Sequence, residues 1–285
     1  MKEERSMKEK SSMKEKSSMK VRSICLGVLS FWSLNVYGVP ISVNLGTADS
    51  FAILAGSTVT NTGPTTVFGN LGLWPGTSVT GFPPGIVSGG TIEAGNATAS
   101  QAQNDLTTAY NFAAGQTCGT NLTGQDLGSL TLTTGVYCFS SSAGLTGTLT
   151  LDAQGDPNAL FLFQMGSTLT TASSSAVAFV NGGQGGSVFW QVGSSATLGT
   201  NSQFAGSILA LTSITLTTGV DIPCGRALAR NGAVTMDTND VSINQAGCGS
   251  NLAAPVPEPG TAGLLSVGLL FCLMGYRRHS RKKAT

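Results

Sequence analysis

Between residues 39 and 255, short stretches recur in which apolar and small polar residues alternate. In each stretch a central apolar residue stands between small, mostly polar neighbours, which is the period-2 pattern of a strand with one buried face. Five stretches share the pattern: 54–60, 163–170, 190–197, 209–215 and 228–235. The last three begin at residues 190, 209 and 228, a constant spacing of 19 residues. A coil of a solenoid fits this length, and stacked coils bury a continuous core that no single coil buries alone.

The repeat predicts a mainly β protein, a β-solenoid. Glycines recur near the expected corners of the coils, where the backbone needs a positive φ or a close approach to its neighbour: Gly193, Gly206, Gly219 and Gly232. The alternative all-β fold, a sandwich, would show hairpin signals between strands. Asn-Gly occurs only at 181–182 and 231–232, which favours the solenoid.

One stretch departs from the β pattern and predicts a single long helix over about 91–114. Its apolar and small residues recur at helical spacing, Glu93 would lie in the first turn, and Gly115 ends the run. The Ala-rich face suits a helix lying close along the side of the solenoid. A dimerising coiled coil, the alternative, would need sustained heptads.

Aligning the five stretches on their central apolar residues brings five threonines into one outward file: Thr60, Thr170, Thr197, Thr215 and Thr235. The outward position before the apolar residue forms a second file of small side chains: Thr58, Thr168, Ser195, Ser213 and Ala233. β-Branched threonine has few χ1 states, so the first file would be rigid. Thr is also a common strand residue, and further alternating threonines at 131–133 and 148–150 show that the residue is widespread here.

Charge and histidine content exclude several classes of function. Of the 15 Lys and Arg residues, 13 lie before Ser23 or after Tyr276, and the body from 39 to 255 carries two basic and nine acidic residues, a formal charge of 2 − 9 = −7. A binder of nucleic-acid backbone is therefore excluded. The only histidine is His279, so the body has neither a histidine-assisted nucleophile nor a histidine-ligated metal.

The remaining candidates for catalytic chemistry have simpler explanations. Asp152 with Asp156, or Asp237 with Asp240, could be paired carboxylates of a polysaccharide-cleaving enzyme. They lie in stretches containing Gly, Asn or Pro, where Asp commonly bonds to its own backbone, so turn formation is favoured. Arg226 and Arg230 are expected to be solvated or paired with an Asp. The sequence predicts no enzyme, no cofactor and no metal.

The sequence predicts sorting signals at both ends of the chain. Residues 1–38 predict a signal peptide with a doubtful N-terminal extension, whose cleavage would follow Gly38. At the other end Pro257, Glu258 and Pro259 precede an apolar span, 261–276, and a basic tail. This order resembles the PEP-CTERM sorting signal, which implies a membrane sorting protease, transient anchoring in the inner membrane and a location at the cell surface or outside the cell. A plain C-terminal anchor is the alternative.

Export allows the cysteines of the body to form disulfides. Cys25 and Cys272 lie in the terminal apolar segments, which leaves four. Proximity in the sequence favours Cys118 with Cys138 and Cys224 with Cys248, although four cysteines permit three pairings. A thiolate metal site is disfavoured because no Cys-x-x-Cys spacing occurs.

Several stretches resemble the microbial ice-binding-protein-like family, in order along the chain: 51–63, 69–76, 188–192, 206–210 and 225–229. The resemblance implies a right-handed discontinuous β-solenoid over 39–250, a long helix alongside, and binding to an ice surface or to ordered water. With the two files it assigns ice binding to Thr58, Thr60, Thr168, Thr170, Ser195, Thr197, Ser213, Thr215 and Thr235. The alternative function is a structural or adhesive matrix protein associated with exopolysaccharide.

Overall fold

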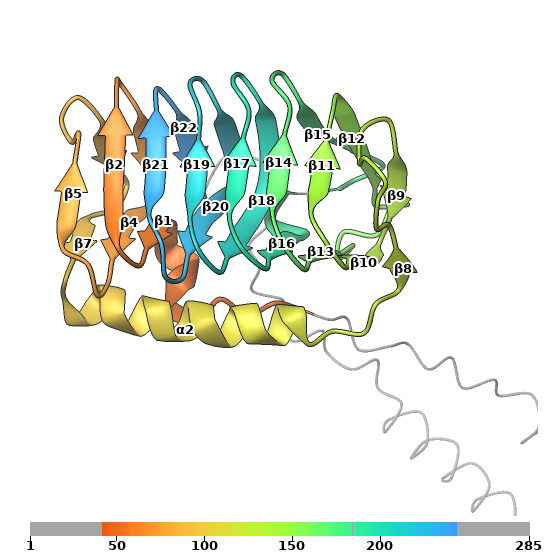
Figure 1. Cartoon of the computed structure of the whole chain (residues 1–285), viewed down its shortest axis with the longest axis horizontal. Helices are drawn as coiled ribbons and strands as arrows, with labels where there is room; N and C mark the ends of the chain where they lie inside the picture. Colours follow the sequence, from red (N-terminus) through yellow and green to blue (C-terminus); the bar gives the residue numbers. More distant parts are fainter. Residues whose placement is uncertain (1–41, 184, 244–285) are drawn as a thin grey trace, which may run out of the picture. The chain divides into compact units, whose positions relative to one another are not determined.

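The computed structural model describes residues 42–183 and 185–243, which form a three-sided β-solenoid with one long helix along one side (Figure 1). All strand pairs are parallel, and their backbone ladders run along the solenoid between successive coils. One side is a seven-stranded sheet, and the other two sides belong to one 15-stranded sheet that bends around a corner. The predicted mainly β solenoid is confirmed.

The seven-stranded sheet takes one short strand from each coil, in the spatial order β11–β14–β17–β19–β21–β2–β5. In Figure 1 these strands lie side by side. Their bounds are β2 Thr58–Thr62, β5 Ser78–Thr80, β11 Ala143–Leu145, β14 Leu169–Thr171, β17 Ala196–Leu198, β19 Ile214–Leu216 and β21 Val234–Asp237.

The 15-stranded sheet supplies a helix-facing side and a third side. The helix-facing side contains β1 Phe51–Ala55, β4 Asn70–Leu73, β7 Ile92–Ala94, β8 Thr120–Asn121, β10 Gly135–Phe139, β13 Phe161–Met165 and β16 Val188–Val192. The third side contains β3 Thr66–Phe68, β6 Ile86–Ser88, β9 Thr131–Thr133, β12 Thr148–Asp152, β15 Ala176–Val180 and β22 Asp240–Ser242. Two longer strands, β18 Gln203–Ala210 and β20 Asp221–Ala229, pair with strands of both sides. The described residues also contain two 3-10 turns, η1 Gly46–Ser50 and η2 Gly185–Ser187.

The order of coils in space differs from their order in the sequence. The last coil pairs with the first, because β20, β21 and β22 lie against β1, β2 and β3. The second coil, β4 to β6, then lies beyond the first. The solenoid is therefore discontinuous, as the family resemblance implied, and the helix carries the chain back toward the opposite end (Figure 1).

Two kinds of glycine allow the tight corners. Gly219 has a φ of +72°, which side chains with a Cβ rarely adopt. Gly232 is required for a different reason, because a Cβ there would lie 2.5 Å from the backbone oxygen of Thr212 in the neighbouring coil. The predicted corner glycines thus act partly through φ and partly through close approach.

The core is a column of side chains that stack from coil to coil. Its centre is an aromatic series in which the Phe163 and Trp190 rings stack with centroids 4.1 Å apart, flanked by Tyr137 and Phe204. Trp190 is fully buried, and its indole Nε1 donates to the backbone oxygen of Ala205. In-register pairing of β10, β13 and β16 produces this stack, because it aligns Tyr137, Phe163 and Trp190.

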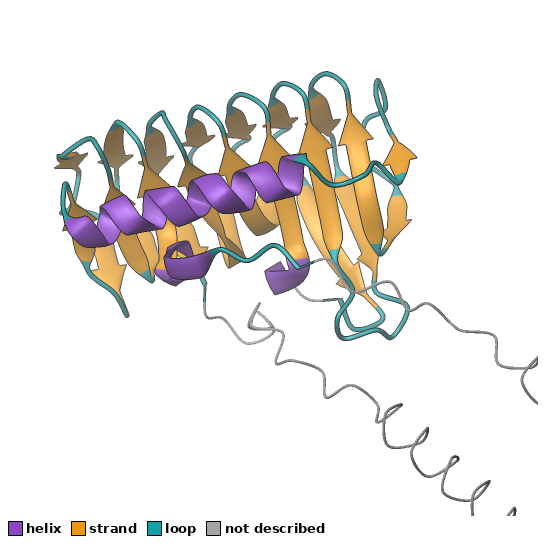
Figure 2. Ribbon diagram, turned by 90° about the horizontal axis from the view of Figure 1, so that it is seen from below, coloured by secondary structure: helices purple, strands orange, loops and turns teal. Residues whose placement is uncertain are grey.

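The long helix, α2, spans Ala97–Ala114 and lies along the helix-facing side (Figure 2). It begins later than the expected residue 91, because residues 92–94 pair with β4 as strand β7. Glu93 is therefore in a strand, and Asn96 is the N-cap, accepting a hydrogen bond from the Ala99 amide. In the described part of the chain, no helix has the length and apolar character of a membrane span.

Polar contacts fix α2 to the strands beneath its apolar face. Gln103 donates to the backbone oxygen of Ala229, and the Tyr110 hydroxyl donates to that of Val192. At the C-terminal end Gln164 of β13 donates to the backbone oxygens of Ala113 and Gln116, which satisfies carbonyl groups left free at a helix end. The helix is thus held at several points along the solenoid.

The two arginines of the body have structural partners. Arg226, 7% exposed, forms a 2.7 Å ion pair with Asp49 and donates twice to the Asp49 backbone oxygen. Arg230 lies over the Tyr110 ring at 4.8 Å and donates to Thr107. Arg226 is paired with an Asp, as expected from the sequence, whereas Arg230 contacts the helix instead.

A disulfide joins Cys118, after α2, to Cys138 of β10, as predicted. It attaches the segment that follows the helix to the solenoid. Cys224 is also disulfide-bonded. Its predicted partner Cys248 lies outside the described residues, as do the predicted signal peptide, Cys25, Cys272 and the segment containing Pro257, Glu258 and Pro259.

The third side carries several carboxylates. Its outward file runs through Thr148, Ala176, Gln203, Asp221, Asp240, Thr66 and Ile86. Partial burial, and secondarily the neighbouring carboxylate of Asp240, raise the pKa of Asp221. This side therefore differs in charge from the seven-stranded sheet.

We expect Trp190→Ala to lower the free energy of unfolding by about 3–5 kcal/mol, because it removes the largest buried ring and leaves a cavity. Urea denaturation followed by circular dichroism measures the loss. A loss well under 1 kcal/mol would contradict the packing described for the aromatic stack.

We expect Asp221→Asn to raise the Tm slightly at neutral pH, by at most about 2 °C. The folded chain binds the Asp221 proton more tightly than the unfolded chain, so the ionised carboxylate destabilises the fold above its pKa and the penalty disappears as pH falls through it. Calorimetry of both proteins between pH 7 and about pH 3 should show the difference shrinking with acidification. A difference that grows would contradict the direction of the pKa shift.

Candidate functional site

The seven-stranded sheet brings the predicted threonines together. Register aligns Thr170 with Thr197, Thr197 with Thr215, and Thr215 with Thr235. Thr235 then pairs with Thr60 across the junction between the last and the first coil. All five lie in one unbroken file although they come from distant parts of the sequence.

The structure adds a sixth threonine to this file. Thr80 of β5 pairs with Thr60 at one end, and Gly144 of β11 pairs with Thr170 at the other. The alignment of the five stretches within the chain did not include either strand, although residues 78–80 show the same alternation. We call Thr80, Thr60, Thr235, Thr215, Thr197 and Thr170 the threonine file.

The second predicted file lies beside the first. Its members Thr168, Ser195, Ser213 and Ala233 each stand just before a strand of the sheet. The first residue of β14, of β17 and of β19 donates a backbone hydrogen bond to the next member of the file, as from Leu169 to the Ser195 oxygen. Thr58 occupies this position on β2, and the register extends it to Ser78 on β5. At the other end the Thr168 hydroxyl donates to the Ser142 hydroxyl at 2.8 Å. Small side chains therefore border the threonine file along its length.

The surface of these two files is open. Thr60, Thr80, Thr170 and Thr235 are exposed, whereas Thr197 and Thr215 are half-buried between their neighbours. The hydrogen bonds and packing of α2 are to β1, β4, β7, β13, β16, β18, β20 and η1, all outside the seven-stranded sheet. Among the outward residues of the seven strands only Asp237 is charged, and it accepts hydrogen bonds from Thr218 and Thr238.

The other alternating threonines do not extend this surface. Thr131 and Thr150 pair with each other on the third side, where the next residue in the file is Ala178. Their neighbours on that side include Asp152 and Gln203. The threonine file is therefore a feature of one sheet and not of every side of the solenoid.

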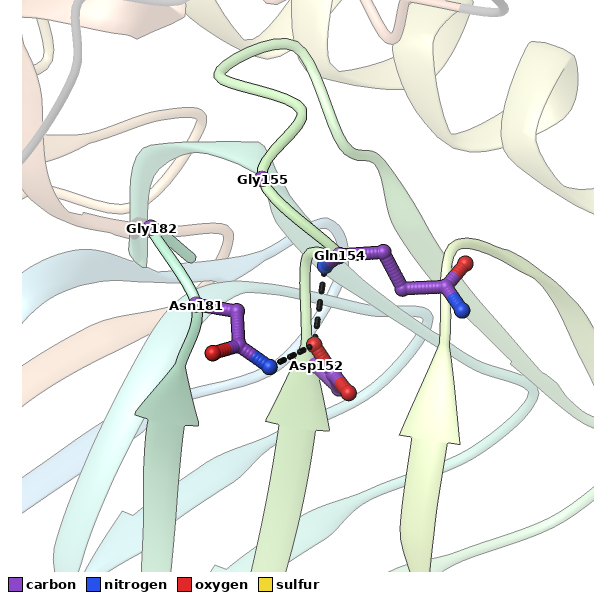
Figure 3. Close-up of a pocket in the computed structure, with 5 residues that line it drawn as sticks. All are labelled: Asp152, Gln154, Gly155, Asn181 and Gly182. Atoms are coloured by element: carbon purple, nitrogen blue, oxygen red, sulfur yellow. Dashed lines mark hydrogen bonds between the residues drawn. The ribbon is translucent and has the colours of Figure 1, made fainter.

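Of the candidate carboxylates, Asp152 and Asp156 form turns, whereas Asp237 and Asp240 lie in strands β21 and β22. Asp152 accepts from the Gln154 amide and the Asn181 side chain at the rim of an open pocket lined by Gln154, Gly155, Asn181 and Gly182 (Figure 3). Those hydrogen bonds, from Asn181 first, lower the pKa of Asp152. Asp156 accepts from the Asn158 amide in the same way. Turn formation, as expected, accounts for the contacts of this pair.

Two family models match the chain. The model described as ice-binding-like matches residues 53–242, and the PEP-CTERM protein-sorting motif matches residues 255–281. The chain is 56% identical to the ice-binding protein of Nostoc sp. (strain HG1) over 91% of its own length and 96% of the relative's. It is 33% identical to ice-binding protein 1 of Shewanella frigidimarina, where it covers 76% of itself and 28% of that longer protein.

Solved structures of ice-binding proteins are also similar to this chain. An ice-binding protein from an Antarctic biological consortium matches with a TM-score of 0.69 at 48% identity, covering 72% of this chain and 92% of that one. The ice-binding protein of the Antarctic ascomycete Antarctomyces psychrotrophicus has a TM-score of 0.69 at 40% identity, with 72% and 100% covered. The sorting motif marks the chain as an exported protein of the cell surface or the extracellular space. Because the ice-binding-like model matches most of the described residues and the Nostoc relative is similar over nearly its whole length, the chain belongs to the ice-binding-like family.

Proposed function

We propose that this exported protein binds ice through the open face of its seven-stranded sheet, with the threonine file at the centre of the contact. The observation that carries the proposal is the unbroken register of six threonines on an uncovered sheet. The names of its relatives support the same function. Adsorption of this kind would inhibit crystal growth or recrystallisation, or hold a cell near ice.

The chemistry of the file suits ordered water. Neighbouring strands lie about 4.8 Å apart, so the six side chains repeat at a constant interval along the solenoid. Threonine methyl groups can hold water in cages, while hydroxyl groups anchor it by hydrogen bonds. A water layer ordered in this way could merge with the lattice of a growing crystal.

Affinity would come from many weak contacts made together. Each threonine has few χ1 states and stands on a paired strand, so little conformational entropy is lost on binding. The hydroxyl side chains of Ser195, Ser213 and Thr168 are no larger than those of the file and leave it accessible to a flat crystal surface. The carboxylates of the third side bind liquid water strongly, and that side lacks a comparable file.

We infer that a sorting protease processes the chain near Pro257, Glu258 and Pro259 after residues 261–276 have held it transiently in the inner membrane. The match to the sorting motif over residues 255–281 supports this order of events. A structural role with exopolysaccharide stays a prediction from the sequence.

Thr215→Tyr should reduce thermal hysteresis and inhibition of ice recrystallisation about tenfold or more, because a ring at the centre of the file prevents close approach of a flat surface. The fold should keep its Tm within about 2 °C, since the side chain points outward. Both activities are measured on the purified body, residues 39–255, beside wild type.

Thr150→Tyr is the matched control, because Thr150 also projects from a strand but on the third side. It should keep wild-type activity. Equal activity of Thr215→Tyr and wild type would contradict the site, and an inactive wild-type protein would contradict the function.

Processing is tested in a bacterial host that has the sorting system. Intact-mass spectrometry of the mature protein should show loss of residues 261–276. Replacing Glu258 by Ala should leave the full C-terminal segment in place and the protein in the membrane fraction. A wild-type protein that keeps the segment would contradict processing.

A further inference from the structure

A row of buried polar side chains follows the threonine file at the corner between the seven-stranded sheet and the third side. Each residue lies one to five positions after the file residue of its own coil. All are buried except Thr217, which is half-buried. We call them the corner ladder: Asn61, Thr65, Thr171, Ser175, Ser202, Thr217 and Asn239.

At one end the ladder joins the coils of β11, β14 and β17. The Ser202 hydroxyl lies 3.1 Å from that of Thr171 and donates to the backbone oxygen of Ala172. The Thr171 hydroxyl in turn accepts from the Gly199 amide at 2.8 Å. Ser175 donates to the backbone oxygen of Leu145 at 2.9 Å, which reaches the coil of β11.

The same pattern continues to the opposite end. Thr217 donates to the Leu198 backbone oxygen, and the Asn239 side chain donates to the Thr217 backbone oxygen, both at 2.7 Å. The backbone N–H of Asn239 donates to the Thr65 hydroxyl across the junction with the first coil. Asn61 donates to the Gly81 backbone oxygen. Each of the six steps between neighbouring coils of the sheet therefore has a side-chain hydrogen bond at this corner.

The core itself does not require polar residues here. Val220 stands at the position that Ser202 and Asn239 occupy in the neighbouring coils, and it is fully buried. An apolar side chain therefore fits the corner. Buried hydroxyl and amide groups are costly unless they are bonded. Every residue of the row makes a hydrogen bond to a neighbouring coil, and Asn61 Oδ1 is the one buried polar side-chain atom of the described residues that has no partner. Unlike an apolar contact, such bonds fix the direction and the distance between two coils.

The corner also holds an unfavourable backbone conformation. Ser174, Asn201 and Thr238 have φ values of 57°, 57° and 52°, in the left-handed region that residues with a Cβ rarely adopt. Each directly precedes a ladder residue: Ser175, Ser202 and Asn239. Such conformations persist where surrounding contacts determine them. The ladder supplies contacts of this kind in every one of these three coils.

We propose that the corner ladder is the positioning element of the ice-binding surface, which sets the spacing and alignment of the coils where their backbones leave the sheet. The inference rests on the proposed function. Ladder residues never touch ice; they act through the threonines a few positions earlier in the same coil. Without a ladder bond, the two coils it joins would shift relative to each other and the file would lose its regular repeat.

The test compares two buried serines by the same substitution. Ser202→Ala removes a ladder hydroxyl, whereas Ser207→Ala removes one that lies on the helix-facing part of β18 and accepts from Arg226. Thermal hysteresis is measured below 0 °C on both variants, and circular dichroism at the same temperature checks that each is folded. Hydrogen exchange at 2 °C follows the amides of β14 and β17.

We expect Ser202→Ala to lower thermal hysteresis at least about twofold and to speed exchange at Thr197 and Thr170 about fivefold, with a larger loss in Ser175→Ala/Ser202→Ala. Ser207→Ala should keep activity and exchange at those two residues close to wild type, even if its Tm falls equally. Full activity of the double variant, or an equal loss in Ser207→Ala, would overturn the inference alone. An inactive wild-type protein would overturn the proposed function, and the positioning role for ice with it.

Discussion

Parallel pairing in register between coils is the interaction on which the rest of this structure depends. Each strand repeats the inward and outward assignment of its neighbour, because a shift by one residue would exchange the two faces. The same register stacks Phe163 on Trp190 inside and aligns Thr197 with Thr215 outside. The core and the candidate site are therefore two products of one backbone ladder.

Much of the fold could be predicted because the repeat is local. Five stretches carried enough alternation to identify coils and to align the threonines, and the Cys118–Cys138 disulfide followed from proximity. The start of the helix was wrong because residues 92–94 gain a tertiary partner, β4, that overrides their helical spacing. Thr80 was missed because β5 follows a stretch with Pro and Gly, which interrupts the alternating pattern.

Other features had no signal within a single coil. The contact of Gln164 with the end of α2 joins residues about 50 positions apart, and Asn239 bonds Thr65 across 174 positions. Such contacts depend on which coils become neighbours, and the order of coils in space was available only through the family resemblance. The corner ladder could not be found before that order was known.

The insertion of the last coil beside the first also constrains how the protein reaches its native state. Strand β1 has two partners, β4 nearby in the sequence and β20 near the end of the described chain. Pairing over such a separation is slow, because a long loop must close before any contact forms. An exported chain of this topology can complete its fold only after almost its whole body has crossed the membrane, so the first two coils must wait with one edge unpaired, exposed to the chaperones and proteases on the far side.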